Sequence, residues 1–218
     1  MAARIKKILI TAGPTREMID PVRFLSNLST GEMGYAIARA AARRKYEVTL
    51  VSGPTGLKPS TGVRFVPIIT AQELKKACAK LFPEHDCLIM AAAVCDFTPA
   101  VSPRHKIPSA AGYTLRLKRT PDILASLAKR KGRRIVIGFC LETRDLVARA
   151  KEKLLGKKLD GIVANFYDPK GQIPFGDRRT EVLLIDSGLN VRSCPKQSKN
   201  QIAARLLDWI ESFPSRKA

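Results

Sequence analysis

The sequence predicts an α/β fold of the Rossmann-like, doubly wound type, with a mostly parallel sheet, an edge hairpin and a long active-site loop. Short apolar runs alternate along the chain with helical patterns, which is typical of strands connected through helices. These runs lack period-two alternation, so helices should cover both faces of the sheet. The 218 residues contain no repeats or linkers, and we expect a single domain spanning 1–218.

Four apolar runs in the first half of the chain predict buried strands, at 6–13, 47–56, 63–69 and 86–94. One helix is expected at 33–44, where small apolar residues share one face, and another at 70–82. Thr70 and Glu73 have the spacing of a capping box, which predicts where the second helix starts.

The second half predicts strands at 135–140 and 160–166 and helices at 121–131 and 144–157. Thr120 is expected to cap the first of these helices, with Pro121 and Asp122 in its first turn. Residues 181–194 predict the edge hairpin, with Ser-Gly near its turn. A last helix is expected at about 198–213, with one apolar face.

Residues 97–119 fit neither pattern. They are irregular, contain proline and glycine, and end in a short alternating strand. This segment follows the carboxyl end of a central strand, where open α/β sheets bind their ligands. Because long loops in compact domains are usually functional, we expect the active-site loop at about 97–119.

The composition restricts the class of protein. A formal net charge of +20 favours anionic ligands. The five cysteines form no Cys-x-x-Cys pair, so neither a disulfide framework nor a zinc site is indicated. No apolar run approaches the roughly 18 residues of a membrane span. We expect a cytoplasmic protein without a membrane partner.

The loops after four predicted strands should meet at one crevice. They follow Ala12, Ala93, Phe139 and Asn165 and carry TAGPTRE, AAVCDF, GFCLET and ANFYD. Glycine and aspartate commonly serve turns, so each loop alone is ambiguous. Four polar or glycine-containing loops at the same edge of the sheet indicate a binding site more strongly.

The stretch DPVRFLSNLSTGEMG (20–34) leads into the first helix. Backbone N–H groups at a helix start bind phosphate well, and Gly31 and Gly34 would allow a ligand to approach closely. The alternative is that Ser29 or Thr30 merely caps the helix. The Gly-x-Gly-x-x-Gly spacing is absent, which disfavours a plain NAD-dependent dehydrogenase.

Several segments together resemble one family. ILITAGPTREMIDPVRFLSNLSTGEMGYAIARAA, MAAAVCDF, HKIP, KRTPDIL, GFCLET and KLLGKKLDGIVAN are similar, in this order, to phosphopantothenoylcysteine synthetase (phosphopantothenate–cysteine ligase). The resemblance covers about 6–186, and its most specific part is the block Asp-Pro-Val-Arg…Ser-Asn…Ser-x-Gly-x-Met-Gly. It implies a stand-alone ligase without the flavin-dependent decarboxylase half.

The resemblance implies the reaction as well. CTP would activate 4′-phosphopantothenate as an acyl-cytidylate, and L-cysteine would then displace CMP, as a step of coenzyme A biosynthesis. Mg²⁺ would bridge the phosphates, although no carboxylate cluster identifies its ligands. CTP is expected, while ATP stays open as the alternative. The resemblance further implies a homodimer and, as a candidate partner, a separate phosphopantothenoylcysteine decarboxylase.

Individual roles are also implied by the resemblance. Asn27 would fix the acyl-nucleotide carbonyl, and Lys106 would close over the phosphates and stabilise charge in both half-reactions. Arg23 would contact substrate phosphate from across a dimer. The residues implied in nucleotide binding are Gly13, Ser29, Gly31, Met33, Gly34, Ala93, Asp96, Phe139, Lys153 and Lys157.

Within this nucleotide-binding set, Ser29 and the 31–34 backbone would hold the triphosphate. Asp96 would accept hydrogen bonds from the ribose, and the backbone around Ala93 and Phe139 would read the base. Lys153 and Lys157 lie four residues apart on one helix, a spacing that a solvated face also produces.

Three positions depart from the family pattern. Glu32 stands where lysine is common, Thr180 stands where asparagine is usual, and Cys95 replaces a small residue beside Asp96. Glu32 would reduce the positive charge beside the phosphates.

The main alternative is a basic Rossmann-like protein that binds nucleic acid, with basic clusters at 43–45, 129–134 and 215–218. Aromatic residues make up only 6% and are not interleaved with these clusters, so nucleic acid is disfavoured as a partner. A short-chain reductase is disfavoured because no Tyr-x-x-x-Lys pair lies at a strand–helix junction near the crevice.

Overall fold

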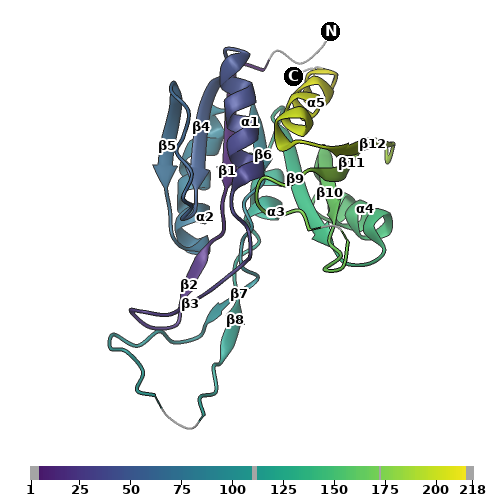
Figure 1. Cartoon of the computed structure of the whole chain (residues 1–218). Helices are drawn as coiled ribbons and strands as arrows, with labels where there is room; N and C mark the ends of the chain where they lie inside the picture. The colour runs from purple at the N-terminus through teal and green to yellow at the C-terminus, as the bar shows by residue number, and fades with distance from the viewer. Residues whose placement is uncertain (1–4, 110–111, 172, 215–218) are drawn as a thin grey trace.

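One eight-stranded sheet forms the centre of the protein in a computed structural model that describes residues 5–109, 112–171 and 173–214. Six parallel strands run in the order β5-β4-β1-β6-β9-β10, and β11 and β12 extend the sheet as an antiparallel hairpin (Figure 1). The strands are β1 (Lys7–Ala12), β4 (Glu47–Ser52), β5 (Val63–Pro67), β6 (Cys87–Met90), β9 (Ile135–Glu142), β10 (Gly161–Phe166), β11 (Thr180–Asp186) and β12 (Val191–Gln197). This confirms the predicted doubly wound, mostly parallel sheet with an edge hairpin.

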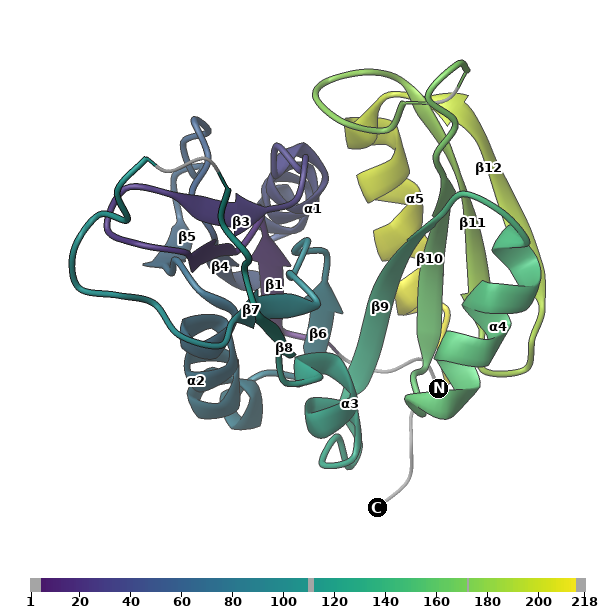
Figure 2. The same cartoon turned by 90° about the horizontal axis from the view of Figure 1, so that it is seen from below.

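Helices cover both faces of the sheet (Figure 2). Helices α1 (Glu32–Arg43) and α5 (Lys199–Glu211) pack on one face, and α2 (Ala71–Leu81), α3 (Ile123–Ala128) and α4 (Leu146–Gly156) pack on the other, with a short 3-10 turn at Phe82–Glu84. In β1, Ile8 and Ile10 belong to the first apolar layer and Leu9 to the second. Because both faces are buried, the strands show no polar alternation. None of the helices in the described residues is long and apolar enough to cross a bilayer.

Two helix starts differ from the expectation. Helix α3 begins at Ile123, and its N-cap is Asp122, which accepts a hydrogen bond from the Ala125 N–H (2.9 Å). Thr120, the expected cap, instead donates its hydroxyl to the Cys95 carbonyl oxygen (2.6 Å). At α2, Thr70 accepts from the Glu73 N–H as predicted, but the Glu73 carboxylate accepts from the N–H of the preceding Ile69 (2.7 Å).

Two small hairpins, which we call the arms, project beyond the carboxyl edge of the sheet (Figure 1). The first pairs β2 (Arg16–Met18) with β3 (Phe24–Ser26), and the second pairs β7 (Phe97–Pro99) with β8 (Leu117–Arg119). The first hairpin was not predicted, and the second forms the base of the expected 97–119 loop. Strands of three residues are too short to produce a recognisable apolar period.

Asp20 ties the two arms together. Its buried carboxylate accepts hydrogen bonds from the N–H groups of Val22 (2.8 Å), Arg23 (2.9 Å) and Ile107 (3.2 Å). The Arg23 guanidinium binds the same carboxylate (2.5 Å) and the Ile107 carbonyl oxygen (2.8 Å). The hydrogen bonds from Arg23 hold the pKa of Asp20 well below its usual range. The two arms are therefore joined by the Asp20–Arg23 ion pair and by the hydrogen bonds that both residues make to Ile107.

Candidate active site

The crevice lies where β1 and β6 run side by side. The chain leaves β1 for α1 on one face and leaves β6 for α3 on the other, which opens a gap at their carboxyl ends. The two loops are tied across this gap, since Ala93 N–H donates to the Gly13 carbonyl oxygen (2.9 Å) and Thr15 N–H donates to the Ala93 carbonyl oxygen (3.2 Å). The Asn27 side-chain amide donates to the same Ala93 oxygen (3.1 Å), which adds the loop before α1.

A cleft of about 520 Å³ opens on the β6–β9 side of this gap. Its lining residues are Met90, Ala92, Val94, Cys95, Asp96, Phe97, Arg119, Thr120, Pro121, Asp122, Ile123, Leu124, Phe139, Lys153 and Lys157. Four of the predicted residues, Asp96, Phe139, Lys153 and Lys157, therefore share one cleft. The wall at 119–124 was missed, because Thr-Pro-Asp was interpreted only as a helix start.

The two lysines of α4 are held by carboxylates. Lys153 binds the buried Glu142 at the end of β9 (2.5 Å), and Lys157 binds Asp122 across the cleft (2.9 Å). Arg149 also binds Glu142 (2.6 Å). Burial acts to raise the pKa of Glu142, but the hydrogen bonds from Lys153 and Arg149 outweigh it and lower the pKa. The lysines are thus oriented cations on the cleft wall, and the solvated-face interpretation is wrong for both.

Asp96 and Phe139 differ from the two lysines, because the Asp96 carboxylate and the Phe139 backbone are available to a ligand. The exposed Asp96 carboxylate makes no hydrogen bond or ion pair within the described ranges, so it can accept hydrogen bonds from hydroxyl groups of a ligand. Phe139 follows Gly138, the last residue of β9 that pairs with β6 through Met90. The backbone of Phe139 therefore lies at the cleft, beyond the point where β6 pairs with β9.

Ala93 does not face the cleft as expected. Its N–H and its carbonyl oxygen are both used in the tie between loops, with Gly13, Thr15 and Asn27 as partners. Its neighbours Ala92 and Val94 line the cleft in its place. The backbone around Ala93 therefore borders the cleft through these neighbours, and its role in reading a base stays a prediction.

The start of α1 is not capped by a side chain. Gly31 is its N-cap, in the left-handed region at φ 84°, and no side chain among the described residues accepts a hydrogen bond from the first turn. Ser29 Oγ accepts from the Gly31 N–H (3.3 Å), and Thr30 Oγ1 accepts from the Gly176 N–H (3.1 Å). The alternative in which Ser29 or Thr30 caps the helix is therefore wrong. Unpaired N–H groups at a helix start carry partial positive charge and can bind an anion.

The glycines around this helix start permit close packing of the chain on itself. A Cβ on Gly34 would lie 2.5 Å from the Cβ of Ala12 in β1, and a Cβ on Gly31 would lie 2.8 Å from Thr55 Cγ2. Gly13 adopts φ 70°, and a Cβ there would lie 2.9 Å from the same methyl group. The absence of a side chain at these three positions is therefore required by packing, and close approach of a ligand to the Gly31 and Gly34 backbone stays a prediction.

The remaining predicted residues lie outside the cleft. Met33 is half-buried and packs against the apolar layer under α1. Lys106 is exposed on an arm, and Arg23 is bound to Asp20 and Ile107 of its own chain. Among the described residues, no group of three or more His, Cys, Asp or Glu side chains could hold a metal ion.

Comparisons with known proteins agree with this architecture. Residues 3–213 match the family described as DNA/pantothenate metabolism flavoprotein C-terminal domain. The coenzyme A biosynthesis bifunctional protein CoaBC of Bacillus subtilis (strain 168) is 42% identical over 95% of this chain and 52% of the relative. The chain thus spans about half the length of such curated relatives.

Two solved structures show the same fold over nearly their full length. The C-terminal domain of coenzyme A biosynthesis bifunctional protein CoaBC has a TM-score of 0.80 and 37% identity, with 94% of both chains covered. The DNA/pantothenate metabolism flavoprotein from Streptococcus pneumoniae has a TM-score of 0.81 and 27% identity, with 95% of this chain and 99% of that one covered.

Proposed function

We propose, because the chain belongs to the family of DNA/pantothenate metabolism flavoprotein C-terminal domains, that it is a ligase of coenzyme A biosynthesis. It joins 4′-phosphopantothenate to L-cysteine with CTP and gives 4′-phosphopantothenoyl-L-cysteine, CMP and pyrophosphate. The observation that carries this proposal is the cleft on the β6–β9 side of the gap, where Asp96, Phe139, Lys153 and Lys157 meet. The relatives named as coenzyme A biosynthesis proteins support it.

The reaction proceeds in two displacements. A carboxylate oxygen of phosphopantothenate attacks the α-phosphorus of CTP and pyrophosphate leaves; the cysteine amine then attacks the acyl carbon and CMP leaves. Both reactants of the first step are anions, so fixed positive charge is the main requirement. The uncapped start of α1 beside Ser29 supplies it for the triphosphate, and Lys153 and Lys157 supply it along the cleft. Asp96 accepts hydrogen bonds from the ribose hydroxyls.

Asn27 and Lys106 act on the acyl group and the developing charge in this proposal. Asn27 is held at the junction of the loops by its hydrogen bond to Ala93, beside the cleft wall. Lys106 stands on the arm, next to Ile107, whose backbone is bonded to Asp20 and Arg23. Lys106 is exposed and does not line the cleft, so a movement of the arm or a second chain would bring its ammonium to the triphosphate.

Mg²⁺ fits this site as an ion held chiefly by phosphate oxygens and water, since Mg²⁺ commonly binds through one or two carboxylates plus substrate phosphates. Asp96 on the cleft wall is assigned to the ribose, so phosphate oxygens and water would supply the ligands of the ion. The ion would neutralise triphosphate charge during pyrophosphate departure.

A homodimer formed through the arms is the assembly that we propose. The arms and the loop after β3 expose large apolar side chains: Val22, Phe24, Leu28, Phe97, Val101, Tyr113 and Leu117, each between 41% and 75% exposed. Apolar patches of this kind mark interfaces. The edge hairpin offers a second candidate surface, but its free strand β12 carries Arg192, Pro195 and Lys196, which discourage pairing of strand edges.

Location and a further partner follow from the same proposal. All five cysteines are free and buried, which fits the reducing cytoplasm. A separate phosphopantothenoylcysteine decarboxylase is the proposed partner, because the curated relatives named CoaBC are bifunctional and about twice the length of this chain. Co-elution of the two purified proteins tests that contact.

The test of the proposed function is a product analysis. Purified protein is incubated with phosphopantothenate, cysteine, Mg²⁺ and either CTP or ATP. We expect pyrophosphate and CMP with CTP, formed only when phosphopantothenate is present. Release of orthophosphate would contradict the acyl-nucleotide route. If AMP forms from ATP more efficiently than CMP forms from CTP, ATP is the substrate and the assignment of CTP is wrong.

A further inference from the structure

Lys199 is a buried lysine outside the cleft. It is the first residue of α5, it is 8% exposed, and its ammonium donates hydrogen bonds to the carbonyl oxygens of Gly176 and Arg178. Burial lowers its pKa, while the nearby carboxylates Glu32 and Asp177 act to raise it. A buried ammonium is costly unless it is hydrogen-bonded, so these carbonyl contacts are required where Lys199 sits.

Gly176 connects Lys199 to the start of α1. Its carbonyl oxygen accepts from Lys199, and its N–H donates to Thr30 Oγ1 (3.1 Å). Thr30 directly precedes Gly31, the N-cap of α1. Two successive hydrogen bonds therefore lead from the Lys199 ammonium to the uncapped helix start.

The segment 173–179, which contains Gly176 and Arg178, also has the buried Pro174 and two further contacts among the described residues. Phe175 packs its ring against Tyr167 (5.7 Å between centroids), and Arg179 donates to the Lys196 carbonyl oxygen (3.3 Å). Gly176 itself adopts φ 72°. The contact with Thr30 ties this segment to the start of α1, and the contacts with Lys199 tie it to the start of α5.

Lys199 also interacts electrostatically with Glu32, the residue that departs from the family pattern. This acidic residue at the first position of α1 lies close enough to Lys199 to raise its pKa. A buried cation therefore stands beside the helix start even though residue 32 is a carboxylate.

We propose that Lys199 is a positioning residue for nucleotide binding: it holds segment 173–179 against Thr30 and so keeps the start of α1 shaped for the triphosphate. This inference rests on the proposed function. Lys199 does not line the cleft, so it acts on the ligand only through Gly176 and Thr30.

The kinetic test compares two ways of breaking the same connection. Lys199→Met removes the ammonium, and Thr30→Val removes the acceptor oxygen. Each should raise KM for CTP about tenfold, less than the roughly 100-fold cost of misplacing reacting groups, and should leave kcat within about twofold. Since both act through Gly176, the double variant should show no larger effect than the worse single variant. Thr30→Ser, which keeps the hydroxyl, should stay near the wild type.

Lys131→Met is the matched control. Lys131 is also a largely buried lysine, bound to the Lys158 carbonyl oxygen (2.6 Å) and to Asp160 (2.8 Å), but it lies away from the start of α1. Its loss should lower Tm without changing KM for CTP. If Lys199→Met lowers Tm and leaves KM unchanged, or if the effects of Lys199→Met and Thr30→Val multiply, the inference is wrong.

A second readout does not depend on the ligase activity. Segment 173–179 contains Arg178 and Arg179, both exposed trypsin sites. Lys199→Met should accelerate tryptic cleavage after them severalfold, as identified by mass spectrometry, whereas Lys131→Met should not. Unchanged cleavage overturns the inference even if the enzyme assay fails. Absence of pyrophosphate release by the wild type, together with faster cleavage in Lys199→Met, would reject the proposed function alone.

Discussion

At the scale of single residues, the charges of the cleft are paired before any ligand binds. Glu142 holds Lys153 and Arg149, and Asp122 holds Lys157. Such pairs fix the direction of long side chains that would otherwise lose rotamer freedom on binding. The cleft is in this respect preorganised for an anion.

Glu142→Gln tests this pairing. The folded-state pKa of Glu142 is lowered, so its contribution to stability is present above the unfolded pKa of about 4.3 and is lost as pH falls through the folded pKa. We expect the variant to lose about 1–3 kcal/mol at pH 7, the usual cost of a lost charged hydrogen bond. The difference from the wild type should shrink as the pH falls through the folded pKa of Glu142. Denaturant unfolding at several pH values measures it.

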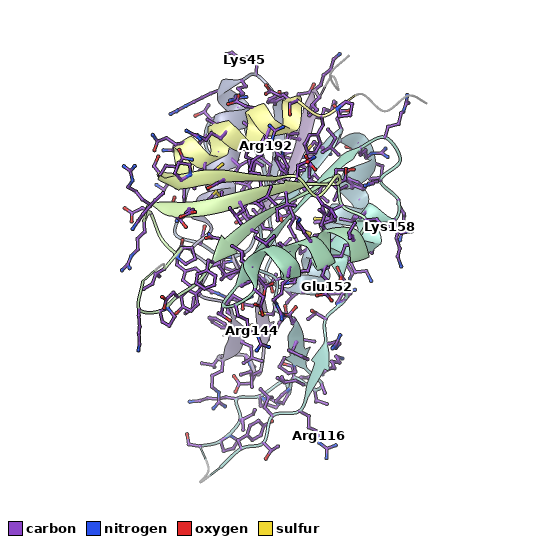
Figure 3. The ribbon with its side chains drawn as sticks, turned by 90° about the vertical axis from the view of Figure 1, so that its right-hand side faces the viewer. Lys45, Arg116, Arg144, Glu152, Lys158 and Arg192 are labelled. Atoms are coloured by element: carbon purple, nitrogen blue, oxygen red, sulfur yellow. The ribbon has the colours of Figure 1, made fainter. Side chains whose placement is uncertain are left out.

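Glu152→Gln is the control for this experiment. Glu152 is an exposed glutamate on helix α4 (Figure 3), the helix that carries Arg149 and Lys153, and it makes no ion pair within the part of the chain that the structure describes. Its replacement should be nearly neutral at every pH. An equal loss in both variants would mean that removing either carboxylate is destabilising in itself and that the pairing of Glu142 with Lys153 and Arg149 is not the cause.

Asn27→Asp separates the two half-reactions. The neutral amide contributes little to bringing triphosphate and carboxylate together, so pyrophosphate release should continue. Losing a transition-state contact typically costs about 10²–10³ in rate, so phosphopantothenoyl-cytidylate should accumulate with cysteine present, visible by mass spectrometry. Lys106→Ala should instead slow both steps. If Asn27→Asp loses the first step and traps nothing, Asn27 only positions the loop through Ala93.

At the scale of elements, α1 is placed by how closely it meets β1. The approach is possible because Gly34 has no side chain, and it brings the helix start to the carboxyl edge of the sheet, beside the Gly13 loop. A helix held further away would point its first N–H groups elsewhere. Close packing and ligand binding are thus linked through one glycine.

Gly34→Ala tests this close packing, because the packing decides whether the substitution raises or lowers the stability of the protein. In an exposed helix, alanine is more stable than glycine by about 0.5–1 kcal/mol. Here the added Cβ would lie 2.5 Å from the Ala12 Cβ, and such overpacking typically costs about 1–3 kcal/mol, so the variant should be less stable. Thermal unfolding decides the sign. Gly156→Ala, at the end of α4 with no atom within 4 Å of the new Cβ, should be neutral or stabilising.

At the scale of the whole molecule, the positively charged side chains are spread over the surface of the described residues and do not form one continuous basic groove. The labelled cations Lys45, Arg116, Arg144, Lys158 and Arg192 lie on separate parts of the surface (Figure 3). Clusters 43–45 and 129–134 precede β4 and β9 and so lie at the amino edge of the sheet, opposite the cleft. The cluster at 215–218 lies outside the described residues. A spread charge attracts small anions from solution at long range.

The proposed dimer is tested by replacing one apolar side chain on each candidate surface. Leu117 on the arms and Val191 on β12 are similarly exposed, at 46% and 43%. Leu117→Glu should convert the dimer into monomers, because a charge buried without a partner is costly, and Val191→Glu should leave it intact. Light scattering measures both. Dissociation by Val191→Glu alone would assign the dimer to the edge hairpin, and a wild-type monomer with full activity would reject the dimer.

The sequence by itself determined the sheet, its covered faces and the edge at which the loops meet. These features depend on apolar runs and on helix signals that are local in the chain, such as Thr70 before α2. The segments that resemble a known ligase also pointed to the family, which the match over 3–213 shows.

Only the tertiary structure decided which loop groups are free to act. Ala93 looked available, yet both its backbone groups are used by neighbours distant in sequence. Thr30 looked like a cap, yet it bonds Gly176, which is 146 residues away. Such hydrogen bonds follow from how separate elements pack, and no local pattern encodes them. The hairpin of β2 and β3 escaped prediction for the same reason, since it is stabilised by contacts such as Asp20 with Ile107, whereas the short strand at the end of 97–119 was predicted and is β8.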